Sequence, residues 1–199
     1  MDTKRLLFTL TLLAQVLLNG SLVLQIRRPQ LRIWPPPGRR SFGFVFTWGL
    51  FAFSTFGVLA LGVLDWNTFV FRHPSRFWVA VPLMLGGLGL ALWGVRTLSV
   101  HTALGLEGEL VTHGPYRFTR NPQYVGDILL LLGYGLFTNS TLALAAGTFM
   151  SIWFLLAPFV EEPYLRARFG PAYEAYARRV PRFVGWRSVK ALWQAFRKI

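Results

Sequence analysis

The amino-acid sequence predicts an all-α polytopic membrane protein with five transmembrane helices. Three apolar stretches have about the 20 residues needed to cross about 30 Å of hydrocarbon: 6–26, 42–64 and 77–98. Two further apolar stretches contain only one charged residue, Asp127, and lie at 122–138 and 141–160. Hydrophobic residues make up 53% of the chain. We therefore expect one integral-membrane domain over residues 1–199.

The distribution of charge predicts the topology. The formal net charge is +13, but Lys and Arg avoid the apolar stretches and gather just outside them, as positive-inside topology requires. With five spans, 17 of the 21 basic residues lie on one side, and four lie on the other: Lys4, Arg5, Arg72 and Arg76. We expect the amino terminus outside and the carboxyl terminus in the cytoplasm. Because the basic residues follow the membrane pattern, we expect no nucleic-acid partner.

Residue usage also limits the chemistry. The chain has no cysteine, which excludes disulfides, a thiolate nucleophile and Cys-ligated metal. Its histidines, His73, His101 and His113, lack metal-site spacing, and we expect no metal. The first apolar stretch is too long for the core of a signal peptide and ends at Arg27 and Arg28, so we interpret it as a retained span.

The first three spans are explained by membrane packing. The loop after 6–26 is basic and proline-rich, and we interpret its Trp34 as an interfacial anchor. The third span carries four glycines, Gly86, Gly87, Gly89 and Gly94. Because no strand precedes them, we do not interpret them as a glycine-rich nucleotide-binding loop. Small residues at such positions allow helices to pack closely.

The stretch 114–126 is where aromatic, basic and turn-forming residues crowd between two apolar segments. Asn121 followed by Pro122 predicts a helix that begins at Pro122 and is capped by the Asn side chain. The positive end of this helix points into a loop that suits an anionic or zwitterionic ligand. The loop and first turn carry Tyr116, Arg117, Arg120 and Tyr124.

The fourth and fifth spans should form a tight antiparallel hairpin. Only Asn139 and Ser140 separate 122–138 from 141–160, and they are best interpreted as a turn and helix cap. The hairpin returns Glu161 and Glu162 to the side of the 114–126 stretch, and Pro158 should kink the fifth span. Ordinary ion pairs with Arg166 and Arg168 are the alternative role of the two acids. For Asp127 we expect a structural role more than a ligand contact.

The carboxyl-terminal part should form a cytoplasmic helical segment. A short helix is expected over 171–180, with Tyr173 and Tyr176 three residues apart. From Trp186 to Ile199, apolar residues fall on one helical face, which predicts an amphipathic interfacial helix over about 186–199.

These motifs resemble the integral-membrane methyltransferases that include isoprenylcysteine carboxyl methyltransferase and phospholipid methyltransferases. The resemblance covers about 110–183. It is carried by Arg120-Asn-Pro-Gln-Tyr-Val-Gly126, Glu161-Glu162, Phe169-Gly170, Tyr173-Glu-Ala-Tyr176 and Val180-Pro-Arg182. The chain departs from the family at Asn121, where the family usually has His, because Asn can form hydrogen bonds there but cannot be protonated.

The resemblance implies S-adenosylmethionine as cofactor and a cytoplasmic site built from about 101–126 and 158–182. Arginines or helix amides would hold the cofactor carboxylate, acids its ammonium and ribose, and aromatic rings its adenine. The candidate cofactor-binding residues are Tyr116, Arg117, Arg120, Asn121, Pro122, Tyr124, Gly126, Glu161 and Glu162.

Methyl transfer depends mainly on alignment and electrostatics, so the absence of a catalytic triad is no objection. Arg96 would orient a carboxylate acceptor, whereas His101 or Glu162 would accept a proton from an amine or thiol. We expect a lipid or other amphiphilic acceptor that enters from the bilayer. The alternatives are a membrane protein that binds a lipid or nucleotide-like ligand without catalysis and, with less support, a transporter fragment.

Overall fold

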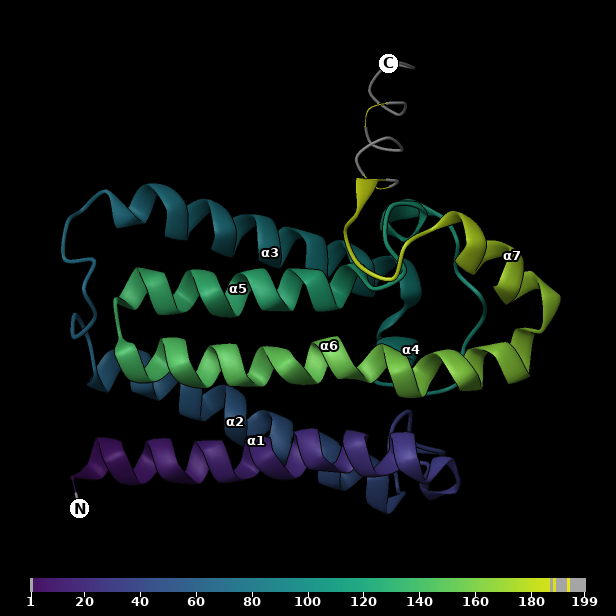
Figure 1. The fold of residues 1–199 in the computed structure, drawn as a ribbon, viewed down its shortest axis with the longest axis horizontal. Helices are drawn as coiled ribbons and strands as arrows, with labels where there is room; N and C mark the ends of the chain where they lie inside the picture. The colour runs from purple at the N-terminus through teal and green to yellow at the C-terminus, as the bar shows by residue number, and fades with distance from the viewer. Residues whose placement is uncertain (1, 187, 189–192, 194–199) are drawn as a thin grey trace.

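The computed structural model describes residues 2–186, 188 and 193, and within this part the chain is helical with no strand. Five long helices form the body of the molecule (Figure 1): α1 (Thr3–Arg27), α2 (Phe42–Leu64), α3 (Arg76–Leu98), α5 (Pro122–Thr138) and α6 (Thr141–Phe169). The shorter elements are η1 (Pro29–Leu31), α4 (Val100–Ala103), η2 (Gly114–Arg117) and α7 (Pro171–Arg179). The all-α fold class is confirmed for these residues.

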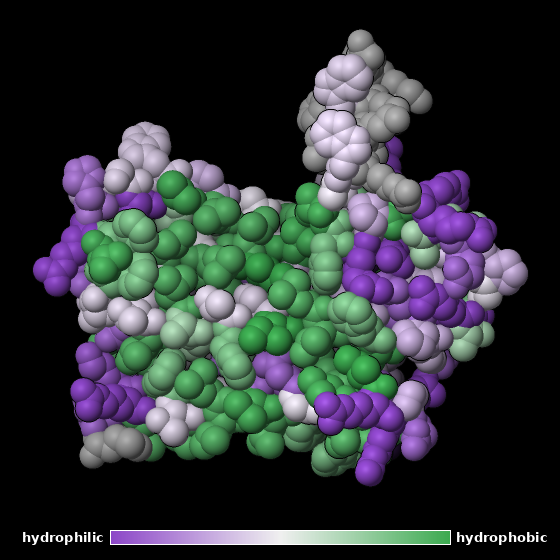
Figure 2. Space-filling view, in the orientation of Figure 1, coloured by the Kyte–Doolittle hydropathy of each residue, from purple (hydrophilic) through white to green (hydrophobic). Residues whose placement is uncertain are grey.

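Four of the described helices, α1, α2, α3 and α6, are long and apolar enough to cross a membrane. In Figure 2 hydrophobic residues cover the middle of the visible face, and hydrophilic residues gather toward its two ends. The chain is an integral membrane protein. Helix α5 has 17 residues and is the shortest of the five long helices, so a fifth crossing stays a prediction.

Glycines allow α3 to lie directly against α5. A methyl group at Gly87 would lie 2.6 Å from the carbonyl oxygen of Gly126, and one at Gly126 would lie 2.5 Å from that of Gly87. At Gly94 the nearest atoms belong to Gln123 and Pro122. These contacts confirm the predicted role in helix packing for Gly87 and Gly94, whereas Gly86 and Gly89 have no atom within 4 Å of an added methyl group.

Polar side chains join the helix ends at the amino-terminal end of the bundle. Asp65, 4% exposed, accepts hydrogen bonds from Thr68, Ser140 and the backbone N–H of Leu142, and it pairs with Lys4 at 3.2 Å. Burial acts to raise the pKa of Asp65, but together these donors hold it below its ordinary value. Asn139 adopts a left-handed conformation at the end of α5, and the Ser140 hydroxyl caps α6, as predicted for this turn.

At the opposite end, segments that are far apart in sequence meet. The loop after α1 is held by Gln25, whose side chain accepts from the N–H groups of Ile33 and Trp34 and donates to the carbonyl of Trp34. Helix α6 continues through Pro158 and Pro163 to Phe169, nine residues past the expected end of the fifth span at 160, and turns into α7 at Gly170. The predicted amphipathic helix over 186–199 lies largely outside the described residues.

Candidate active site

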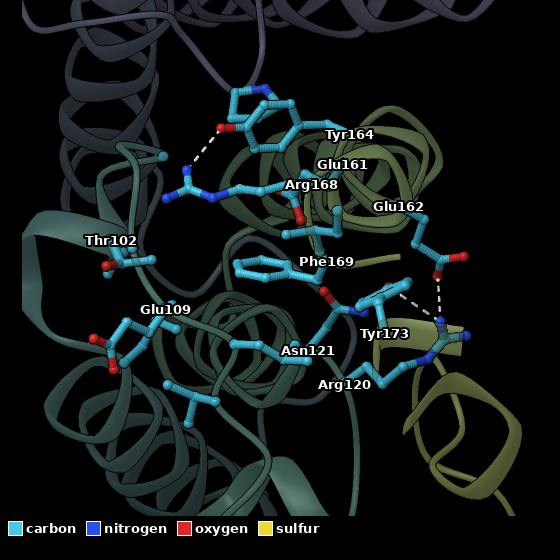
Figure 3. Close-up of a pocket in the computed structure, with 18 of the residues that line it drawn as sticks. Thr102, Glu109, Arg120, Asn121, Glu161, Glu162, Tyr164, Arg168, Phe169 and Tyr173 are labelled. Atoms are coloured by element: carbon cyan, nitrogen blue, oxygen red, sulfur yellow. Dashed lines mark hydrogen bonds and ion pairs between the residues drawn. The ribbon is translucent and has the colours of Figure 1, made fainter. Parts of the chain in front are cut away.

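A cavity opens at this end of the bundle, between the end of α6 and the segments that connect α3 to α5. Its walls come from Trp34 and Pro35, the end of α3, residues 102–111, Tyr116, the start of α5, the end of α6 and α7. Figure 3 shows acidic, basic and aromatic side chains turned toward it from several of these segments. The cavity is therefore assembled from both sequence regions that we expected to form a site.

Glu161 is fixed by neutral donors. Its Oε1 accepts hydrogen bonds from the indole N–H of Trp34 and the hydroxyl of Tyr124. No ion pair to Glu161 occurs in the described part of the chain. The side chain also lines the cavity, so its carboxylate is oriented there without a cation of its own.

Glu162 has a different environment. It is 3% exposed and lies among three guanidinium groups, those of Arg182 at 2.6 Å, Arg120 at 3.1 Å and Arg166 at 3.4 Å. The two hydrogen bonds from Arg182 are bidentate, and they raise the pKa of Arg182. This cluster joins the end of α6 to the loop before α5 and to the segment after α7. Pairing with Arg166 was expected as the ordinary role of the acids, whereas Arg168 pairs with Glu107 at 3.5 Å.

The start of α5 differs in detail from the prediction. The helix begins at Pro122, as expected, but the Asn121 side chain makes no cap hydrogen bond. Its amide instead donates to the carbonyl oxygen of Arg182 at 2.9 Å, and the Thr119 hydroxyl accepts from the Asn121 N–H. The capping prediction was wrong because the neighbouring segment after α7 offers a carbonyl that a local sequence pattern does not reveal. Asn121 still lines the cavity.

Tyrosines form part of the remaining wall. The Tyr173 hydroxyl accepts from Arg120 at 3.2 Å, and the Tyr176 hydroxyl donates to the backbone carbonyl of Tyr116 at 2.7 Å. All three tyrosines are buried, and burial raises each pKa above its ordinary value. They therefore present neutral hydroxyls and ring faces at neutral pH.

Residues 105–111 form one wall of the cavity, and an exposed polar cluster connects them to α6. Glu107 accepts a hydrogen bond from Tyr164 at 3.3 Å and pairs with Arg168 at 3.5 Å and Arg32 at 3.8 Å. Figure 3 shows Tyr164 and Arg168 together at one side of the cavity and Thr102 and Glu109 at the other. Such exposed ion pairs are weak, so they contribute little to holding this wall against α6.

Six of the residues proposed from sequence line the cavity: Tyr116, Arg120, Asn121, Tyr124, Glu161 and Glu162. The other five do not. Arg96, His101 and Arg117 are exposed, and the Arg117 guanidinium lies over the ring of Phe118. Pro122 and Gly126 are buried against α3, where they pack helices together.

Sequence reasoning missed the role of Trp34. It is 3% exposed and lines the cavity, so its interpretation as an interfacial anchor was wrong. Sequence reasoning also did not single out Arg182, which pairs with Glu162. Its membership of the Val180-Pro-Arg182 motif was the one signal in the sequence that could have indicated this role. Among the described residues, no group of three or more His, Cys, Asp or Glu is placed to hold a metal ion.

The fold and the cavity define a helical membrane protein with a cavity at one end of its bundle. Residues 75–172 match the family model of phospholipid methyltransferases. The match covers just under half of the chain, and it confirms the resemblance to this family that the motifs indicated.

Curated relatives carry two kinds of name. The chain is 39% identical over 115 residues to the cobalt-zinc-cadmium resistance protein CzcN of Cupriavidus metallidurans, covering 53% of this chain and 50% of that protein. It is 37% identical over 114 residues to the nickel-cobalt-cadmium resistance protein NccN of Alcaligenes xylosoxydans xylosoxydans, covering 53% and 51%. The chain thus spans about half the length of these relatives. A probable protein-S-isoprenylcysteine O-methyltransferase of Oryza sativa subsp. indica is 35% identical over 74 residues, covering 36% and 38%. No solved structure matches the chain.

Proposed function

We propose that this protein transfers a methyl group from S-adenosylmethionine to a lipid or other amphiphile at the cytoplasmic face of the membrane. One observation carries the proposal. Residues of the family motif from two distant regions meet in a single cavity at the end of a membrane bundle. The cytoplasmic placement rests on the 17 basic residues assigned to that side of the 21 in the chain.

The side chains of the cavity fit the charges of this cofactor. The Nε of Arg120 is buried and has no hydrogen-bond partner among the described residues. Three guanidiniums surround the carboxylate of Glu162, and one of them, that of Arg166, also pairs with Glu174, which leaves one net positive charge for the cofactor carboxylate. Glu161 offers an oriented carboxylate to a cationic centre. Apolar side chains from Leu106, Leu110 and Phe169 supply contacts for adenine.

S-adenosylmethionine supplies a methyl group activated by a positively charged sulfur. An acceptor's lone pair would form the new bond to the methyl carbon while the electrons of the carbon–sulfur bond stayed with sulfur, and an amine or thiol acceptor would also release a proton. Trp34 and Tyr124 fix Glu161, and Glu162 fixes Arg120 and Arg182. The chain therefore contributes mainly orientation and electrostatics.

This arrangement assigns different roles to the residues first considered catalytic. Glu162 is occupied by three guanidiniums, so we assign it to positioning and assign the cofactor contact to Glu161. Arg96 and His101 do not line the cavity, and the proposal gives neither of them a part in it.

Calorimetric titration of S-adenosylhomocysteine into the purified protein tests the proposal. A charge-assisted hydrogen bond contributes about 1.5–3 kcal/mol, so Glu161→Gln should weaken binding about 10- to 150-fold. Glu174→Gln removes an equal charge at an exposed position on α7 and should bind as the wild type does. Unchanged affinity in Glu161→Gln would contradict the assignment of this residue.

Turnover of methyl-labelled cofactor with a membrane lipid extract separates an enzyme from a protein that only binds its ligand. We expect label in the lipid fraction with wild-type protein. Cofactor binding without any transfer would support the non-catalytic alternative.

A further inference from the structure

The loop that follows α1 contributes side chains to the cavity from outside the region that matches the family model. That match covers residues 75–172, whereas Trp34 and Pro35 belong to the segment between α1 and α2. Both residues line the cavity. In Figure 1 this loop lies at the same end of the bundle as α4 and α7. The family match therefore leaves out part of the wall of the site.

Both hydrogen bonds that fix Glu161 end on the same carboxylate oxygen. The indole N–H of Trp34 and the hydroxyl of Tyr124 both donate to Oε1, and Oε2 accepts no hydrogen bond from the described residues. Two donors on one oxygen define the plane of the carboxylate and leave the lone pairs of the other oxygen for a ligand. Tyr124 lies within the motif that the sequence shares with the family, whereas Trp34 does not.

Trp34 is itself held by three other parts of the chain. The Gln25 side chain, 5% exposed near the end of α1, bonds to the backbone N–H and C=O of Trp34. The Trp153 ring of α6 packs edge-on against the Trp34 ring, with the two centroids 5.2 Å apart. Gly105 lies close to the same ring, because a methyl group at this position would be 2.7 Å from it. These contacts fix the direction of the indole N–H independently of Glu161.

We propose that Trp34 is a positioning residue of the cofactor site and that Gln25 acts through it. Because the indole N–H already fixes one oxygen of Glu161, an incoming ligand does not bear the entropic cost of ordering this carboxylate, and preorganised groups bind more tightly than mobile ones. The inference rests on the proposed function for the identity of the ligand. It extends the site to α1 and the loop after it, which lie outside the family match.

Titration of S-adenosylhomocysteine into wild type, Trp34→Phe, Glu161→Gln and the double variant tests this inference. Trp34→Phe removes the N–H but keeps an aromatic ring, and it should weaken binding about 3- to 10-fold, the effect of one net hydrogen bond. In the Glu161→Gln background the same change should alter affinity at most about 2-fold, because the carboxylate that Trp34 orients is gone. Wild-type affinity in Trp34→Phe, or an equal loss in both backgrounds, would overturn the inference.

Trp153→Phe is the matched control for packing. It makes the same exchange in the same aromatic cluster, but the Trp153 N–H is buried and has no hydrogen-bond partner among the described residues. This variant should keep wild-type affinity, and a loss equal to that of Trp34→Phe would assign the effect to packing and overturn the inference. Gln25→Met keeps the side-chain length, removes the hydrogen bonds to the loop and should weaken binding in the same direction. If Gln25→Met does not fold, Trp34→Phe decides.

Turnover of methyl-labelled cofactor separates positioning from structural damage. The KM of Trp34→Phe for the cofactor should rise with the loss of affinity, while kcat at saturating cofactor stays near that of wild type. A lower kcat with unchanged KM would contradict positioning.

Failure of the proposed function gives a different result. If wild-type protein does not bind S-adenosylhomocysteine, the proposed function is rejected, and the thermal unfolding of the same four proteins decides whether Trp34 holds Glu161. Non-additive losses of stability in the double variant would support this contact, and additive losses would overturn it.

Discussion

Glu161 and Glu162 show how neighbouring residues acquire different roles. Successive side chains on an α-helix diverge by about 100° around the axis. One acid therefore meets the indole of Trp34 and the hydroxyl of Tyr124, while the other meets Arg120, Arg166 and Arg182. A sequence pattern presents them as an equivalent pair, but the helix places only Glu161 where a ligand cation has no competing arginine.

Removing the charge of Glu162 should destabilise the fold. Loss of one partner from a buried ion pair costs about 3–5 kcal/mol, and because Arg166 and Arg182 reach solvent we expect about 2–3 kcal/mol for Glu162→Gln. Thermal unfolding in detergent measures the change. Glu174→Gln should cost at most about 1 kcal/mol, since both members of its pair with Arg166 are exposed. Equal stability of the two variants would show that the cluster does not support the fold.

The sequence predicted the identity of several site residues better than their contacts. Arg120, Tyr124 and Glu161 were found because motif chemistry is local. The positions of Trp34 and Asn121 depend on segments distant in sequence, namely the end of α6 and the backbone of Arg182. Contacts of that kind follow from tertiary packing, so the residue pattern around each position could not reveal them.

For whole helices, too, the sequence predicts where each helix lies along the chain better than it predicts how helices such as α3 and α5 pack together. Helix α2 has the predicted bounds, and α3 begins one residue earlier than predicted, because long apolar stretches and their polar flanks fix where such helices start and end. Which glycine of α3 faces α5 follows only from the packing. The continuation of α6 past residue 160 and through Pro163 was also missed, since neighbouring helices help membrane helices to tolerate proline.

Adjacent glycines on α3 should respond differently to the same substitution. An Ala methyl at position 87 would lie 2.6 Å from the backbone oxygen of Gly126 and force the helices apart, whereas position 86 has nothing within 4 Å. We expect Gly87→Ala to cost about 1–3 kcal/mol and Gly86→Ala to be neutral or slightly stabilising. Thermal unfolding of both variants under one detergent condition measures this. A stable Gly87→Ala protein would mean that α3 and α5 can separate at little cost.

At the scale of the whole molecule, Asp65 connects three helices at the end opposite the cavity. Its contacts come from α1 through Lys4, from the α2 to α3 loop through Thr68, and from the start of α6 through Ser140 and Leu142. The site and this cluster lie at opposite ends of the bundle, so the cluster can be perturbed without touching cavity residues.

Acid should weaken this connection. The folded pKa of Asp65 is below the ordinary 3.8, so the ionised carboxylate stabilises the fold above that pH and its contribution is lost as the pH falls through the folded value. We expect Asp65→Asn to be less stable than wild type at neutral pH and the difference to shrink below about pH 4. Unfolding midpoints of both proteins across this pH range test the expectation. A difference that does not change with pH would exclude ionisation as its cause.

The length of α6 fixes the depth of Glu161, and with it that of the cavity, in the bilayer. Glu161 follows the start of this helix at Thr141 by twenty residues, which at 1.5 Å each is about 30 Å, the thickness of the hydrocarbon layer. If α6 spans the bilayer from its first turn, the acid lies at the boundary between acyl chains and headgroups. Because the helix has a fixed length, a bilayer that is too thick or too thin would displace the reactive atom of the proposed acceptor from the cavity through hydrophobic mismatch.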